Sequence, residues 1–90
     1  MSDRVLARFS GRVQGVGFRA SVLHHARGLT VHGFVRNDPD GSVLLDVDGR
    51  RSELEELISR IQSRPAGELD HCDVSWVESL GRDDGLRIAY

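Results

Sequence analysis

The 90-residue chain has no lysine, one cysteine and no long apolar run, and each absence excludes a class of function. All twelve basic residues are arginine, which excludes a Schiff-base lysine and a Walker-type phosphate lysine. The single cysteine, Cys72, excludes an intrachain disulfide and a cysteine-based zinc site. No apolar run approaches the roughly 18 residues that span a bilayer, so we expect a cytoplasmic protein with no membrane partner.

The chain also lacks an excess of charge of either sign. Twelve basic residues against fourteen acidic ones give a net charge of -2, so we expect no nucleic-acid partner. Hydrophobic residues make up 39% of the chain and charged residues 29%, a mixture typical of a folded protein rather than a disordered one. A chain of this length folds around one core, which predicts a single domain over residues 1–90.

Five segments predict strands: apolar residues alternate with polar ones in the first, fourth and fifth, and the second and third are β-rich stretches joined by the turn sequence at 38–41. These segments are 5–10, 31–37, 42–47, 72–76 and 86–90. Two further segments have apolar residues at helical spacing. The first helix is expected from Phe18 to Gly28, with Leu29 on its apolar side, and the second from a capping box at Ser52 and Glu55 to just before Pro65.

This order of elements is βαββαβ followed closely by one more strand. It is the split βαβ arrangement, in which two helices cover one face of a mostly antiparallel sheet. The sequence therefore predicts an α+β, ferredoxin-like sandwich with a short C-terminal fifth strand.

A glycine-rich segment, Gly11-Arg12-Val13-Gln14-Gly15-Val16-Gly17-Phe18-Arg19, lies between the first strand and the first helix. Glycine allows a positive φ, so successive N–H groups can point into one concavity and bind an anion. The helix start adds unpaired N–H groups, and the fork of Arg19 fits two phosphate oxygens. A cation beside the positive end of a helix is unfavourable unless an anion lies between them. The segment thus predicts a site for a phosphate-sized dianion, although its glycines alone fit a simple turn equally well.

Asn37 ends the segment 31–37, just before the turn sequence at 38–41. Its carboxamide donates and accepts hydrogen bonds without titrating, which suits it to orient a water molecule. The residue by itself fits an Asx turn equally well. In a ferredoxin-like order the strand 31–37 can lie beside the strand 5–10, and we expect this to bring Asn37 to the mouth of the glycine-rich loop.

The other reactive side chains form no recognisable site. His24 and His25 fall in the middle of the first helix, and His71 falls in the loop before the fourth strand. None has a carboxylate at the spacing of a metal site or a catalytic triad. His32 can face solvent, and Cys72 is expected to be a small, inert hydrophobe. The sequence therefore predicts no metal and no cofactor.

The glycine-rich motif, the residues Gly33–Asn37 and the residues Asp40–Val43 together closely resemble the acylphosphatase family, over essentially the whole chain. The resemblance implies a monomeric hydrolase that converts small acyl phosphates to a carboxylate and inorganic phosphate. It implies that Arg19 binds phosphate and that Asn37 holds the attacking water, these two being the catalytic residues. It also implies that the phosphate site is formed by Gly11, Arg12, Val13, Gln14, Gly15, Val16, Gly17, Phe18 and Arg19.

The chemistry agrees with the residues that the chain lacks. The leaving group of an acyl phosphate is a carboxylate, whose conjugate acid has a pKa of about 4. It leaves without a proton, so hydrolysis needs charge neutralisation and a positioned water rather than a strong general acid. The sequence does not identify the physiological acyl phosphate.

The same sequence features bear on three other interpretations. An RNA-recognition module shares the βαββαβ order, but it needs aromatic residues on its central strands and the segment 42–48 has none. A catalytically silent domain that binds a small molecule stays open, because the fold alone does not define a function. The third is an acylphosphatase-like segment of a larger carbamoyl-transfer protein. No cysteine-rich extension follows Tyr90, so we expect the chain to stand alone.

Overall fold

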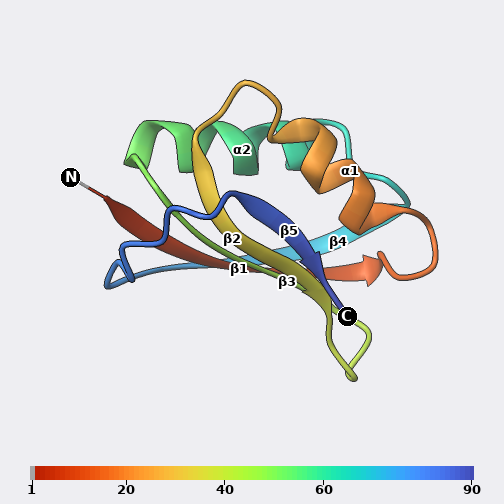
Figure 1. The fold of residues 1–90 in the computed structure, drawn as a ribbon. Coiled ribbons are helices and arrows are strands. Elements are labelled where there is room, and N and C mark those ends of the chain that lie inside the picture. Colours follow the sequence, from red (N-terminus) through yellow and green to blue (C-terminus); the bar gives the residue numbers. More distant parts are fainter. Residues whose placement is uncertain (1) are drawn as a thin grey trace.

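Five strands and two helices make up the computed structural model, which describes residues 2–90 (Figure 1). The strands are β1 (Asp3–Arg12), β2 (Val31–Asn37), β3 (Val43–Gly49), β4 (Glu68–Val77) and β5 (Leu86–Ala89). The helices are α1 (Phe18–His25) and α2 (Arg51–Ser63). Every element that the sequence pattern predicts is present, in the predicted order.

The strands form one sheet in the order β4-β1-β3-β2-β5, and both helices lie on the same face of it (Figure 1). All neighbours are antiparallel except β2 and β5, which are parallel. The predicted ferredoxin-like α+β fold with a short fifth strand is therefore confirmed. The expectation that β2 lies beside β1 is wrong, because the tight hairpin returns the chain from β2 into β3, and β3 fills the position between them.

The core lies between the sheet and the helices. Alternate residues of β1, namely Val5, Ala7 and Phe9, are completely buried, as the two-residue period of a strand requires. From α2, Leu54 and Ile61 are completely buried opposite them. Burying a side chain of this size stabilises the fold by about 1.5–3 kcal/mol. This packing anchors β1 in the core, and β1 leads into the glycine-rich loop.

One end of each helix differs from the predicted one: α1 begins at Phe18 and α2 ends before Pro65 as expected, but the end of α1 and the start of α2 do not match. α1 ends at His25, because the next N–H groups form the tighter bonds of a closing turn, such as Arg27 N–H to the carbonyl oxygen of His24. Leu29 therefore lies outside the helix. The capping box at Ser52 is also wrong: the N-cap residue of α2 is Arg50, two residues before Ser52, and it forms no side-chain cap.

β4 is longer than predicted and contains His71, which was expected in the preceding loop. It pairs with β1 along most of its length, with a register shift between Ser10 and Gly11. The pairing continues to Arg12, so β1 extends into the beginning of the glycine-rich motif. Neither helix of residues 2–90 is long and apolar enough to cross a membrane.

Candidate active site

The loop between β1 and α1 depends on glycine for its conformation. Gly15 and Gly17 have φ angles of 74° and 79°, in the left-handed region that residues with a Cβ rarely adopt. Gly17 is also the N-cap residue of α1, and it forms no side-chain cap. The first turn of α1 contains no acidic residue. The helix therefore presents free N–H groups and the positive end of its dipole at this loop.

A hollow of about 200 Å³ lies where this loop meets the ends of β2 and β5. Its lining residues are Val13, Gly15, Gly17, Phe18, Arg19, Ala20, Asn37, Ile88 and Tyr90. The two predicted catalytic residues thus share one hollow with two glycines of the loop. β2 need not lie beside β1 for this, because Asn37 is the last residue of its strand and faces the loop from the sheet's end.

Arg19 lies in the first turn of α1 with its positive charge unneutralised. Among the described residues no carboxylate forms an ion pair with it. Its guanidinium carbon lies 5.0 Å from the ring centre of Tyr90, an aromatic side chain that is itself fully exposed. A guanidinium and a helix N-terminus that meet at one place form a strongly positive position, which suits an anion.

Asn37 has a side-chain oxygen that is not used by the protein. Its Oδ1 atom is buried, and no described residue donates a hydrogen bond to it. An unsatisfied buried acceptor costs about 1–3 kcal/mol, so this oxygen strongly favours a donor from a small molecule in the hollow. Water and a protonated substrate oxygen are both suitable donors.

Four of the nine residues predicted to bind phosphate do not line the hollow: Gly11, Arg12, Gln14 and Val16. Gly11 and Arg12 belong to β1 and pair with β4. A Cβ on Gly11 would lie 2.4 Å from the backbone oxygen of Glu68, so glycine is required here by strand packing. Val16 is 38% exposed and lies against Gly67.

The side chain of Gln14 reaches away from the hollow. Its Nε2 donates to the backbone oxygens of Asp38 and Ser42, at 2.8 Å and 2.9 Å. These two residues stand on either side of the turn between β2 and β3. Both amide hydrogens are therefore used within the protein.

A group of ion pairs that the sequence analysis did not identify holds the same turn. The Asp38 carboxylate accepts hydrogen bonds from Arg8 and from Arg36, and the guanidinium of Arg8 lowers the pKa of Asp38, with Arg36 acting in the same direction. The turn sequence does indicate that Asp38 is a turn residue. No local pattern identifies Arg8 as its partner, because this contact depends on which strand lies beside β1.

Ile88 and Tyr90 were also missed as site residues. The sequence predicts a fifth strand, but local patterns do not show that β5 pairs in parallel with β2. That pairing brings the last residues of the chain to the end of β2, next to the glycine-rich loop (Figure 1).

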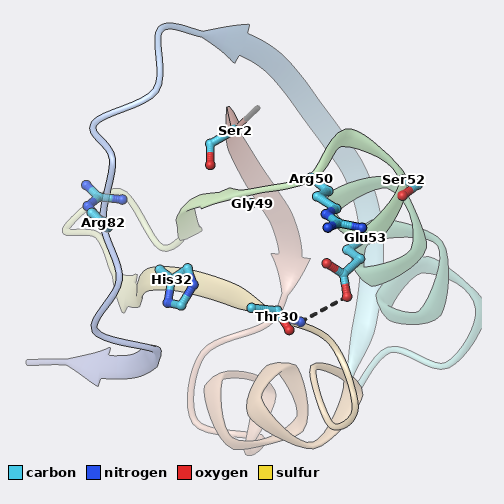
Figure 2. A pocket seen from close by; sticks show the side chains of 8 residues that line it. All are labelled: Ser2, Thr30, His32, Gly49, Arg50, Ser52, Glu53 and Arg82. Carbon is cyan, nitrogen blue, oxygen red and sulfur yellow. Dashed lines mark hydrogen bonds between the residues drawn. The ribbon is translucent and has the colours of Figure 1, made fainter.

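A larger hollow, of about 620 Å³, lies elsewhere, at the N-terminal end of α2 (Figure 2). Its lining residues are Ser2, Thr30, His32, Gly49, Arg50, Ser52, Glu53 and Arg82. None of them belongs to the glycine-rich motif. The Glu53 side chain accepts a hydrogen bond from the backbone N–H of Thr30, and His32 is half-buried with its Nδ1 accepting from Gly85. Size alone therefore does not identify the active site.

The remaining reactive residues lie apart from the active-site hollow. Within residues 2–90 no three histidine, cysteine or acidic side chains gather as metal ligands would. His25 contacts the backbone oxygen of Arg64, and His71 lies 3.0 Å from a carboxylate oxygen of Asp73. Cys72 is half-buried, and this burial raises the pKa of its thiol, which disfavours the reactive thiolate.

Comparison with known proteins agrees with this geometry. A family model described as Acylphosphatase matches residues 5–88. An acylphosphatase of Salinibacter ruber is 43% identical over 86 residues, which cover 94% of this chain and 90% of that protein. The crystal structure of an acylphosphatase from Bacillus subtilis superposes with a TM-score of 0.89, at 28% identity and over all of both chains. T. kodakarensis HypF contains a similar fold, with a TM-score of 0.80 and 26% identity, over 99% of this chain and 12% of that one. The chain therefore belongs to the acylphosphatase family.

Proposed function

We propose that this chain is an acylphosphatase that hydrolyses small acyl phosphates to a carboxylate and inorganic phosphate. Family membership supports the reaction. One observation carries the roles of the residues: Arg19, two loop glycines and Asn37 line the same hollow. In this proposal Arg19 and the loop hold the phosphoryl group, and Asn37 orients the water.

The reaction is a displacement at phosphorus. The water oxygen forms a bond to phosphorus as the bond from phosphorus to the acyl oxygen breaks, and the electron pair of that bond leaves with the carboxylate. The proton lost by the water ends on the phosphate product or in solvent. A carboxylate needs no proton to leave, since its conjugate acid has a pKa of about 4. The hollow fits this chemistry, because its lining residues include no histidine and no acidic side chain.

Arg19 and the loop would act on the charge of the phosphoryl group. A phosphoryl-transfer transition state spreads negative charge over three oxygens, and fixed donors aimed at them lower its energy. Arg19 supplies a planar pair of donors, and the uncapped start of α1 supplies backbone N–H groups. Val13, Phe18 and Ile88 line the same hollow and lower the local dielectric constant, which strengthens these interactions.

Asn37 would place the nucleophile. Its buried Oδ1 would accept a hydrogen bond from the attacking water and so fix the direction of the water lone pair. Holding the two reacting atoms in line replaces a bimolecular encounter with a positioned one, which is a major source of rate acceleration.

We further propose a monomeric, cytoplasmic enzyme, which size-exclusion chromatography and cell fractionation would test.

Release of inorganic phosphate from acetyl phosphate is the direct test, with phenyl phosphate as the control substrate. We expect rapid turnover of acetyl phosphate without added metal and little turnover of the monoester, whose leaving group is much more basic. A silent binding domain would bind inorganic phosphate in calorimetry yet hydrolyse neither compound. That result would refute the proposed function.

A further inference from the structure

The Gln14 side chain connects the glycine-rich loop to the hairpin between β2 and β3. One nitrogen, Nε2, donates to two backbone oxygens, those of Asp38 at 2.8 Å and of Ser42 at 2.9 Å. Because both partners are acceptors, this end of the carboxamide is the NH2 group. The two bonds therefore fix the orientation of the Gln14 carboxamide.

The two oxygens close the neck of the hairpin. The N–H of Asp38 donates to the oxygen of Ser42 at 2.9 Å, and the N–H of Gly41 donates to the oxygen of Asp38 at 3.1 Å. Gln14 adds a second bond to each of these acceptors. The residue directly before this neck is Asn37. A movement of the neck relative to the loop would therefore move Asn37 relative to the bound phosphoryl group.

Arg8 holds the same two hairpin residues through their side chains. Its Nη1 atom donates to the Asp38 carboxylate and, at 2.7 Å, to Ser42 Oγ. Arg8 lies on β1, and Gln14 lies in the loop that follows β1. An ion pair thus holds the hairpin to β1, and the Gln14 amide holds it to the loop. Of these two contacts, only the one from Gln14 links the hairpin directly to the loop.

We propose that Gln14 is a positioning residue, whose side-chain amide sets the separation between the phosphate loop and Asn37. This inference rests on the proposed function, because it assigns Gln14 an effect through Asn37 on the attacking water. A reacting atom that is misplaced by about 1 Å can lose about 100-fold in rate. Phosphate affinity depends on Arg19 and the loop backbone, and the side chain of Gln14 does not line their hollow.

The first measurement compares Gln14→Met with the parent. Methionine has nearly the same length and no donor, so it removes both hydrogen bonds with little change in volume. We expect kcat for acetyl phosphate to fall about 10–100-fold, while the inhibition constant of inorganic phosphate changes by less than about 2-fold. Gln62→Met is the matched control, because Gln62 is exposed on α2 and its variant should keep parental values of both constants.

The second measurement places Gln14→Met in an Asn37→Ala background. If Gln14 acts through Asn37, its removal causes no further loss of kcat once Asn37 is absent. Equal losses of kcat in both backgrounds would overturn the proposal. An equal loss of phosphate affinity and kcat in Gln14→Met would also overturn it, because Gln14 would then be a phosphate ligand.

Activity of the parent separates this inference from the proposed function. A parent that does not hydrolyse acetyl phosphate refutes the function, whereas an active parent with an unchanged Gln14→Met variant refutes only the role of Gln14. Circular dichroism checks folding. Should Gln14→Met be unfolded, Gln14→Asn, whose amide is one methylene too short to reach, is expected to show the same separation of kcat from phosphate affinity. If neither variant folds, Gln14 is a requirement of the fold and the proposal is wrong.

Discussion

Arg19, in the first turn of α1, and Asn37, at the end of β2, line the same hollow from two different elements. The chain between them completes α1, turns, and runs the full length of β2 before it reaches the hollow again (Figure 1). The sheet and the helix thereby fix the two side chains separately. We therefore expect that each can be removed without moving the other, so that their proposed roles can be separated by experiment.

Arg19→Ala is expected to lose both turnover and phosphate affinity. The guanidinium is the one unpaired cation at this hollow in the part of the chain that the structure describes, so its removal leaves only backbone donors. We expect kcat/KM for acetyl phosphate to fall by about 100-fold or more. Steady-state kinetics with inorganic phosphate as competitive inhibitor measures both effects.

Arg27→Ala is the matched control for Arg19, because Arg27 lies just beyond α1, is exposed and does not line the hollow. Lysine at position 19 should restore little activity, since a point charge does not reproduce a planar fork. An Arg19→Ala variant that binds phosphate like the parent would contradict the assignment.

Gly11→Ala is expected to weaken the fold rather than the phosphate site. Gly11 has a φ of 126°, and a Cβ there would lie 2.4 Å from the backbone oxygen of Glu68. The strain and the overlap together should cost about 2–4 kcal/mol in the free energy of unfolding, measured with urea. Gly28→Ala is the control: its φ is 83° but the space around it is open, so only about 1–2 kcal/mol is expected. A Gly11→Ala variant that is as stable as the parent but has lost phosphate affinity would show instead that Gly11 belongs to the phosphate site.

Asp38 should make the fold sensitive to acid. Hydrogen bonds from Arg8 first, and from Arg36, lower the pKa of Asp38 in the folded protein. A carboxyl whose pKa is lower in the folded than in the unfolded state stabilises the fold above the unfolded pKa of about 4. This contribution is lost as the pH falls through the folded pKa. In the parent, the free energy of unfolding should therefore decrease as the pH is lowered below about 4.

Asp38→Asn tests this contribution. At pH 7 we expect it to lower the free energy of unfolding by about 1–2 kcal/mol, a modest value because the Arg8 side chain is 38% exposed. The variant should also lose less stability than the parent between about pH 5 and pH 2, because this range includes the pKa of about 4 that the Asp38 carboxyl has in the unfolded chain. Asp84→Asn, which removes an exposed ion pair with Arg87, should change stability by no more than about 0.5 kcal/mol. Identical pH profiles for parent and Asp38→Asn would show that Asp38 does not stabilise the fold.

Turnover should not depend on a divalent metal ion. Among residues 2–90 no group of three or more potential ligands is close enough to hold one, and the proposed chemistry uses Arg19 for charge neutralisation. We expect the rate of acetyl phosphate hydrolysis to be the same with excess chelator as without it. Loss of activity on chelation, restored by a divalent ion, would reveal a metal requirement that this account lacks.

The sequence was sufficient for the elements because their signals are local. The alternation of Val5, Ala7 and Phe9 marks a strand whichever strand lies beside it, and these residues are completely buried as expected. The glycines of the loop likewise indicate positive φ angles from local sequence alone, and Gly15 and Gly17 have them. The capping box failed because the strand β3 leads directly into α2 at Arg50, which leaves Ser52 inside the helix.

Contacts between distant segments were not predictable in the same way. Gln14 looks like a phosphate ligand in the motif, and only the position of the hairpin shows that its amide is used by Asp38 and Ser42. Arg8 is an ordinary outward-facing residue until the sheet order brings it to the same turn. Tyr90 reaches Arg19 because β5 pairs with β2, a non-local pairing with no sequence signal.

Asn37→Ala tests the central claim most directly, by steady-state kinetics with inorganic phosphate as competitive inhibitor, beside Arg19→Ala. If Asn37 orients the water while Arg19 and the loop hold the phosphoryl group, kcat falls by about 100-fold or more and the inhibition constant of phosphate stays within about 2-fold of the parent. Asp at position 37 should be equally poor, because a carboxylate repels the substrate dianion. A kcat near the parental value in Asn37→Ala, or a loss of phosphate binding as complete as in Arg19→Ala, would contradict the account.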